Sequence, residues 1–432
     1  MRSAPPDRRV VITGLGAITP LGDRATAFFT RLAAGATGMG PPTHWDAATG
    51  PLPAAAEVRD FDPAAYGLSP RELRILAPGP QFALAAAEMA VQDAGLDLPR
   101  QDVRGGARAG TRWDRYGVAI GAAFPGTDLL ATQLTQLAAR GPRGVSPHLF
   151  NMTLPNAATS VVSIRYALGG PLVTVSGATA AGAESVIAAY DKIRSGRADL
   201  MLAGGAEAGV TAIIAAGFAQ NRTGARSGHC RPFDRRRDGT LLGEGAAVFV
   251  LEDRAHALAR GARSYGEILG YGQRADGYDL TDIPEATAPG LTACLREALA
   301  DAGLAPAAVQ YVNAHGTGTA MNDRAELQAL RQVFGPHAAS LYVSSIKGSV
   351  GHALGAAGAI ELLATLLASC YNRVPPTYGL VDPEEPRVVR HVMGQAVAAA
   401  VDVAVSISVG MGGGNAAIVV RGAKLPRPAG LP

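Results

Sequence analysis

Cysteine is scarce in this sequence of 432 residues. Cys230, Cys294 and Cys370 lie far apart and form no C-x-x-C pair. Such spacing indicates neither a disulfide framework nor a zinc site. We therefore expect a protein of the reducing cytoplasm that binds no metal.

Charge and long apolar runs are also sparse. Charged residues make up 17% of the chain, and the formal net charge is only +3, which does not indicate a polyanion-binding protein but leaves room for a local basic patch that meets an acidic partner. No stretch reaches the roughly 18 uninterrupted apolar residues that a membrane-spanning helix needs. The opening residues MRSAPPDRRVV lack the apolar core of a signal peptide. We expect a soluble protein with no nucleic-acid and no membrane partner.

The sequence does contain alternating strand and helix patterns. Short β-rich apolar runs begin at Val10, Tyr116, Ala198, Ala246 and Val403, and alanine-rich helical stretches begin at Gln81, Gly182 and Leu291. This alternation predicts an α/β fold with parallel strand pairs. Two of the helical stretches end in the same D-A-G-L motif, at 93–96 and 301–304. The repeat is a weak sign of a duplicated half, because glycine commonly ends helices.

A glycine-rich turn near the start, GLGAIT at 14–19, invites a dinucleotide-binding interpretation. The motif fails in detail, because Thr19 occupies the third glycine position and Pro20 follows where a helix would begin. A structural turn is the better interpretation.

Two histidines follow strand-like runs in the second half of the chain. His315 ends the run YVNAH and precedes a Gly-Thr turn, while Lys347 and His352 follow another such run. A single histidine at such a place is more often structural than catalytic. Two strand-end histidines with a nearby lysine indicate a site that donates protons or hydrogen bonds.

Thr179 lies on a small-residue turn between a strand ending near Ser176 and a helix beginning around Ala180. The unpaired amides of a helix N-terminus favour negative charge, so an enzyme can place a nucleophile there. Threonine is equally an ordinary N-cap, which is its commoner role at this position.

Several long motifs resemble those of β-ketoacyl-acyl carrier protein synthases of type II fatty-acid and polyketide systems, including their chain-length-factor relatives. They are RRVVITGLGAITPLG from Arg8, RPFDRRRDGTLLGEGAAVFVLED from Arg231, NAHGTGTAMND from Asn313, KGSVGHALGAAGA from Lys347, VPPT from Val374 and VGMGGGNA from Val409. The resemblance implies a duplicated, five-layered αβαβα thiolase-like fold that dimerises through its sheet. It implies an N-terminal half, 1–260, with the nucleophile turn and a C-terminal half, 261–432, with the two histidines.

The resemblance also implies roles for individual residues. His315, His352 and Lys347 match the family's two histidines and lysine, while Asp323 and Glu326 match acidic supporting positions. Thr179 falls where the family has its nucleophilic cysteine, and Val409 and Met411 stand at the two usual phenylalanines of the substrate gate. The implied partner is an acyl carrier protein with a phosphopantetheine-linked acyl chain, and no cofactor is implied.

Replacing a thiol by an alcohol changes the expected chemistry. A threonine hydroxyl is many pKa units more basic than a thiol, and a helix terminus contributes only about 0.3 to 1 kcal/mol. We therefore expect ordinary condensation to be impaired. One hypothesis is an enzyme that decarboxylates malonyl thioesters or transfers acyl groups by altered chemistry. The other is a non-catalytic, chain-length-factor-like subunit that pairs with a cysteine-bearing ketosynthase, so the dimer is either homomeric or heteromeric.

A cluster of arginines at 231 and 235–237 is a possible contact for an acidic carrier protein. Asp234 and Asp238 are interleaved with these arginines. An internal salt-bridged loop is therefore the preferred interpretation.

Overall fold

The computed structural model describes residues 8–103 and 113–432, so most of the N-terminal segment inspected for a signal peptide lies outside the described residues. One 11-stranded sheet runs through the body, in the order β12-β10-β9-β14-β15-β8-β1-β7-β6-β4-β5. Its two halves mirror each other about the β8–β1 pair. The first half contains β1 (Val10–Ile18), β4 (Tyr116–Gly121), β5 (Leu172–Val175), β6 (Leu200–Glu207) and β7 (Gly245–Asp253).

The second half of the sheet is built the same way. It contains β8 (Gly266–Ala275), β9 (Tyr311–Asn313), β10 (Tyr342–Ser344), β12 (Arg390–His391), β14 (Val403–Gly410) and β15 (Gly414–Gly422). Two-residue strands form small separate ladders, β2 (Met39–Gly40) with β3 (Ala55–Ala56) and β11 (Arg373–Val374) with β13 (Val397–Ala398).

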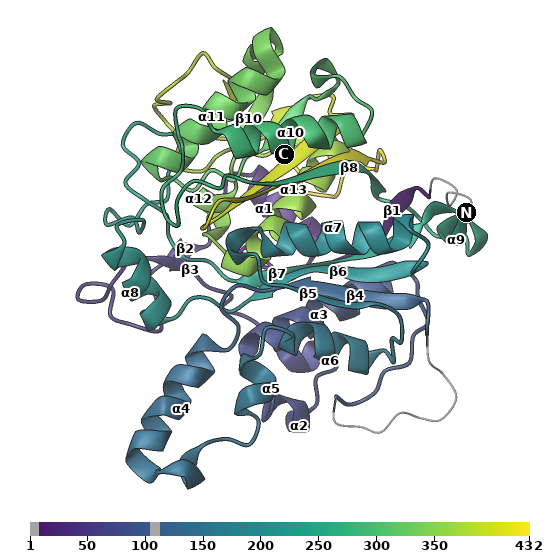
Figure 1. Ribbon diagram of the computed structural model, residues 1–432, viewed down its shortest axis with the longest axis vertical. Coiled ribbons are helices and arrows are strands. Elements are labelled where there is room, and N and C mark those ends of the chain that lie inside the picture. The colour runs from purple at the N-terminus through teal and green to yellow at the C-terminus, as the bar shows by residue number, and fades with distance from the viewer. Residues whose placement is uncertain (1–7, 104–112) are drawn as a thin grey trace.

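Helices form three layers around the two halves of the sheet (Figure 1). The outer layer against the first half is α3 (Pro78–Asp93) with α6 (Ala157–Arg165), and the outer layer against the second half is α10 (Pro289–Asp301) with α11 (Ala320–Phe334). Between the halves lie α7 (Ala181–Arg194) and α13 (Ala357–Tyr371), packed on each other. The layers confirm the expected five-layered thiolase-like α/β fold.

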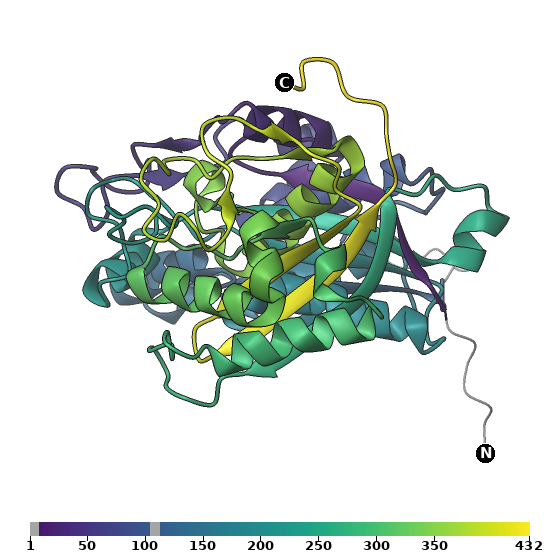
Figure 2. The ribbon, with the colours of Figure 1, turned by 90° about the horizontal axis from the view of Figure 1, so that it is seen from above.

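The remaining helices are short or peripheral. They are α1 (Ala25–Ala33), α2 (Pro70–Leu73), α4 (Thr127–Arg140), α5 (Leu149–Thr153), α8 (Ala212–Gln220), α9 (Arg254–Ala259) and α12 (Lys347–Val350). Of these, α4 projects from the body beside α5 (Figure 1). The tail after β15 runs along the outside of the body (Figure 2), where the amide of Leu425 donates to the Cys370 carbonyl.

The strands read from the sequence are present, but the pairing is mixed rather than parallel throughout. Parallel pairs join β4 to β5 and β6, and β9 to β10 and β14, whereas β1–β7, β6–β7, β14–β15 and β8–β15 are antiparallel. A parallel pair needs a crossover connection. The tight turn between β14 and β15 leaves no room for one, so this pair is antiparallel.

The apolar content is explained by burial. All nine residues of β1 are buried, as expected for a strand covered on both faces. The segment Leu354–Tyr371 is long and apolar enough to cross a membrane, with a mean hydropathy of 1.5. It is wholly buried within the body, and is therefore the central core helix.

Candidate active site

Thr179 lies in a tight turn between β5 and α7. Residues Ala178–Ala180 form one turn of 3-10 helix, and α7 begins at Ala181. Ala178 has a φ of +49°, a left-handed conformation that costs energy for a residue with a side chain. Thr179 is 9% exposed and lines a cavity of about 160 Å³. The turn therefore presents the threonine side chain to this cavity.

The hydroxyl of Thr179 donates a hydrogen bond of 2.5 Å to the carbonyl oxygen of Val409, at the end of β14. Val409 is buried, while Met411 in the following turn is half-exposed. Both residues line the same cavity as Thr179. The two predicted gate positions thus lie beside the predicted nucleophile position. The backbone carbonyl of one of them, Val409, accepts the hydrogen bond from the Thr179 hydroxyl.

His315 follows β9 and is held by a buried lysine. The ammonium of Lys347 lies 3.0 Å from His315 Nδ1 and also donates to the His315 carbonyl oxygen and to the Glu361 carboxylate. An ammonium group has three donors and no acceptor, so its three partners satisfy it fully. Because Lys347 can only donate, Nδ1 of His315 accepts, and the proton of the neutral ring resides on Nε2.

His352 precedes the 3-10 turn Leu354–Ala356 and has the same tautomer for a different reason. The amide of Leu354, at φ +49°, donates to His352 Nδ1 at 3.2 Å. The accepting Nδ1 leaves the single ring proton on Nε2. The rings of His315 and His352 lie edge to face with centroids 5.3 Å apart, and both line the cavity.

Both imidazoles are neutral. Burial lowers the pKa of His315 and of His352 well below the ordinary value for histidine, and the nearby Lys347 ammonium lowers each further. Each ring therefore offers an Nε2–H donor, and each Nδ1 lone pair is already occupied. This arrangement can stabilise a developing oxyanion but provides no free base nitrogen.

The two acidic supporting residues lie behind the histidines rather than in the cavity. Glu326 accepts the backbone amides of His315 at 2.7 Å and Gly316 at 2.5 Å. Burial, together with nearby Asp323, raises the pKa of Glu326 to about 8. Glu326 thus fixes the backbone that carries His315.

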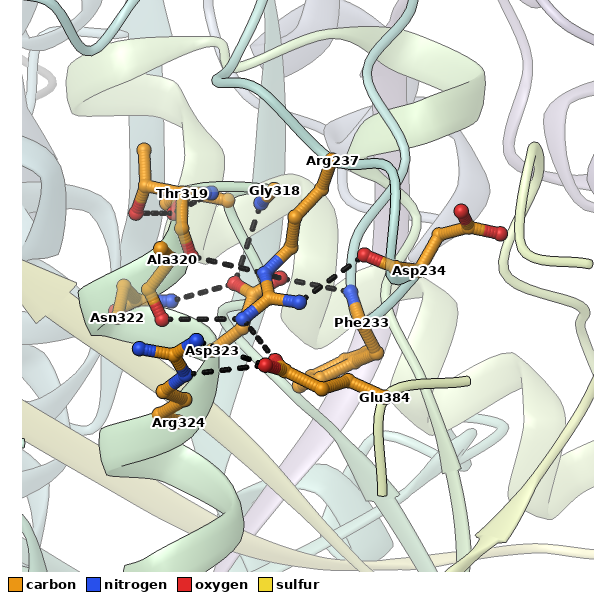
Figure 3. Close-up of polar contacts among 12 residues, drawn as sticks. Phe233, Asp234, Arg237, Gly318, Thr319, Ala320, Asn322, Asp323, Arg324 and Glu384 are labelled. Atoms are coloured by element: carbon orange, nitrogen blue, oxygen red, sulfur yellow. Dashed lines mark hydrogen bonds and ion pairs between the residues drawn. The ribbon is translucent and has the colours of Figure 1, made fainter. Parts of the chain in front are cut away.

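Asp323 organises the neighbouring turn (Figure 3). Its carboxylate accepts the amides of Phe233 at 2.7 Å and Gly318 at 3.2 Å, and it pairs with Arg237 at 3.4 Å. Burial raises the pKa of Asp323. Arg237 also pairs with Glu384, so the turn after His315 is tied to two other loops.

The arginine cluster is a salt-bridged loop, as the sequence predicted. Arg236 pairs with Asp234 at 2.9 Å, and Arg235 pairs with Asp382 at 3.2 Å. Asp238 instead accepts the amide and hydroxyl of Ser227. Together with Arg237, three of the four arginines form ion pairs within the protein.

The structure adds residues to the site that sequence reasoning missed. Glu361, the carboxylate partner of Lys347, lies two residues beyond the motif that begins at Lys347. Phe124 and Phe218 contribute aromatic walls to the cavity, and no local motif marked them. Their distance from Thr179 in the sequence explains this, since only the fold brings them together.

Comparison with known proteins covers nearly the whole chain. Residues 7–257 match the family described as beta-ketoacyl synthase, N-terminal domain, and residues 265–381 match its C-terminal domain. The chain is 40% identical to 3-oxoacyl-[acyl-carrier-protein] synthase 2 of Coxiella burnetii over 418 residues, covering 96% of this chain and 98% of the relative. It is 38% identical to the protein of the same name from Synechocystis over 419 residues, with the same coverage.

Solved structures give the same result. The ishigamide ketosynthase/chain length factor superposes with a TM-score of 0.88 at 33% identity, covering 97% of this chain and 100% of the other. A type II polyketide synthase acyl-carrier protein in complex with its ketosynthase bound to the hexaketide gives 0.84 at 30% identity, with the same coverage. A beta-ketoacyl synthase from Burkholderia phymatum gives 0.86 at 32% identity, covering 96% and 100%. The chain therefore belongs to the β-ketoacyl synthase family.

Proposed function

We propose that this protein decarboxylates malonyl groups carried by an acyl carrier protein in a cytoplasmic type II fatty-acid or polyketide system, without forming an acyl-enzyme. The observation that supports this most directly is the contrast at the cavity. The two histidines offer Nε2–H donors, whereas the hydroxyl of Thr179 is bonded to the Val409 carbonyl.

Acylation of Thr179 lacks a base. An alcohol nucleophile requires a neighbouring group that takes its proton. Both Nδ1 atoms are occupied and both Nε2 atoms carry hydrogen, so neither histidine can do so in this arrangement. A bond from the hydroxyl to a neutral carbonyl also favours the protonated alcohol. Transfer of an acyl chain to Thr179 is therefore strongly disfavoured.

Decarboxylation needs no protein nucleophile. The bond between Cα and the carboxylate carbon breaks, CO₂ leaves, and the electron pair passes into the thioester as an enolate. The Nε2–H groups of His315 and His352 then donate to the enolate oxygen. A proton from water adds to Cα and gives the acetyl thioester. Such positioned donors contribute about 10² to 10³ in kcat per donor.

Mass spectrometry of malonyl-carrier protein incubated with the purified protein tests this proposal. We expect acetyl-carrier protein to accumulate well above a buffer control. Single substitutions His315→Ala and His352→Ala should each return the rate close to that control. An acetyl yield equal to the buffer control for the unaltered protein would reject the decarboxylase.

The second candidate is a partner subunit resembling a chain-length factor, and a specific surface favours it. Strand β5 forms one end of the sheet and pairs only with β4 among the described strands. Every residue of α4 is at least partly exposed, and Leu130, Leu134 and Leu137 form an apolar stripe along it. An open strand edge and an exposed apolar helix face each suit association with a second subunit.

The two candidates predict different assemblies. Co-expression with a cysteine-bearing ketosynthase from the same system should give a stable heterodimer if the partner role holds, and omission of this chain should change product length. A purely homodimeric protein whose removal leaves product length unchanged would reject that role. We also propose that residues 1–260 and 261–432 are the two halves of the duplicated body, which the mirrored strand order supports.

A further inference from the structure

Glu207, the last residue of β6, is a buried carboxylate that the chemistry above does not use. Its side chain is 1% exposed. One oxygen, Oε2, accepts three backbone amides, those of Ala123 at 2.6 Å, Phe124 at 3.1 Å and Gly355 at 3.3 Å. A single carboxylate oxygen therefore joins two segments that are more than 200 positions apart in the sequence.

Both segments belong to the walls of the cavity. Phe124 lines it from the loop after β4, and Leu354 lines it from the 3-10 turn that includes Gly355. The amide of Leu354 is the donor that holds His352 Nδ1. Glu207 thus binds the amide of Gly355, which is the residue next to the one whose amide orients the His352 ring.

The carboxylate is compensated by these amides rather than by a cation. Burial raises the pKa of Glu207 to about 7, and the three amide bonds oppose that rise. Titratable side chains do lie on the elements packed against β6, and they include Glu88 of α3, Glu184 of α7, Glu244 beside β7, His352 before the 3-10 turn and Glu361 of α13. None of them contributes to the pKa shift of Glu207.

We propose that Glu207 is a positioning residue of the site, which fixes the turn carrying His352 against the Phe124 wall through its three amide bonds. Hydrogen bonds to an ionised carboxylate are roughly twice as strong as those to a neutral acceptor. Protonation of Glu207 therefore weakens its hydrogen bonds to the amides of Ala123, Phe124 and Gly355. The ionised form keeps the turn after His352, and with it the His352 ring, in position. The effect on turnover rests on the proposed decarboxylation, but the connection itself does not.

Hydrogen–deuterium exchange tests the connection without any substrate. In Glu207→Ala, peptides covering residues 121–125 and 352–357 should exchange faster together by about tenfold or more, because both lose the same acceptor. In the unaltered protein, after correction for intrinsic rates, protection of both peptides should fall between pH 8 and pH 6. In Glu207→Gln it should be the same at both pH values.

A matched control separates positioning from general destabilisation. Glu88 is also a buried glutamate, but it bonds Arg100 and Tyr166 in another cluster. Glu88→Gln should leave exchange in both peptides unchanged. Unchanged exchange of the two peptides in Glu207→Ala would overturn the proposal, as would independent changes in only one of them. If Glu207→Ala does not fold, the exchange of the two peptides at pH 6 and pH 8 is compared between the unaltered protein and Glu207→Gln. The same pH dependence in both proteins would then overturn the proposal.

Turnover provides the second measurement. In Glu207→Ala, kcat for malonyl decarboxylation should fall about 10- to 100-fold, as expected when a catalytic donor is misplaced by about an ångström, with KM nearly unchanged. In Glu207→Gln, kcat should be independent of pH from 6 to 8 and equal to the low-pH value of the unaltered protein. A complete lack of turnover in the unaltered protein rejects the proposed function, while the exchange result still decides the role of Glu207.

Discussion

The turn carrying Thr179 and the turns carrying His315 and His352 meet at one cavity but differ in how far they match an acyl-transferring site. The histidine side is complete, since a buried lysine and a backbone amide set the tautomers of both rings. The Thr179 side keeps the strained turn at the start of a helix, but its side chain is an alcohol bonded to a carbonyl. Under the proposed function, stabilising an oxyanion and forming an acyl-enzyme are therefore separable.

The largest effect is expected from placing a thiol at position 179, because it would supply the nucleophile that the Thr179 side of the cavity lacks. Thr179→Cys should acquire acyl chains from acyl-carrier protein and condense them with malonyl units, raising condensation by about 10³-fold or more, since removal of a catalytic nucleophile costs at least that much elsewhere. Product analysis by mass spectrometry measures this gain. Thr179→Ser, which keeps an alcohol, serves as the control and should gain nothing.

The next largest effect is expected on the histidine side of the cavity, when one of the two imidazole donors is removed. His352→Ala should lower kcat for malonyl decarboxylation by about 10² to 10³, because one of two oxyanion donors is lost. Steady-state kinetics with malonyl-carrier protein measures the change. His391 is a partly buried histidine, whose pKa burial lowers to about 4, but it lies outside the cavity lining. A rate loss of the same size in His391→Asn would contradict a specific role for His352.

The lysine behind the histidines should matter for stability as well as chemistry. Lys347 and Glu361 are both almost fully buried, and removing one partner of a buried pair costs about 3 to 5 kcal/mol. Lys347→Met should therefore lower the free energy of unfolding by this amount in denaturant titrations. The double variant Lys347→Met/Glu361→Gln should recover a large part of it. Equal losses in the single and double variants would contradict the pairing.

The smallest effect concerns pH. The pKa of Glu326 is about 8 in the folded protein, against about 4.3 for a free glutamate, so the folded state holds a proton that the unfolded state releases. Stability should therefore fall as pH rises from about 5 to 8, by at most about 1.4 kcal/mol per pH unit for this one group.

Glu326→Gln should flatten this slope in denaturant titrations at pH 5.5 and 7.5. Glu297→Gln, at a half-exposed position of α10, should leave the slope unchanged. The same slope in Glu326→Gln as in the unaltered protein would assign the pH dependence to other groups.

Much of the architecture followed from the sequence because the information was local. Apolar runs beginning at Val10, Ala198 and Val403 became buried strands, and the turn before α7 carried Thr179 as expected. The pairing direction was less accessible, since it depends on which strands become neighbours. The antiparallel β6–β7 pair joins strands separated by α8 and a long loop, which strand patterns alone do not reveal.

The sequence predicted the site residues that lie within recognisable motifs, and it did not predict the others. His315, Lys347 and His352 stood in recognisable segments, and the structure brings the two histidines to the cavity with Thr179. Glu207 contacts the site only by accepting backbone amides, and Phe124 lines the cavity from a loop distant in sequence. Such contacts depend on the folded positions of main-chain atoms, so no sequence pattern could have assigned them.

The central claim is that the alcohol at position 179 stays free of acyl groups while the histidine side works. Intact-protein mass spectrometry after incubation with acyl- and malonyl-carrier protein tests it directly. We predict an unmodified chain together with accumulating acetyl-carrier protein. An ester on the peptide that contains Thr179, formed and released at the rate of product formation, would contradict the account.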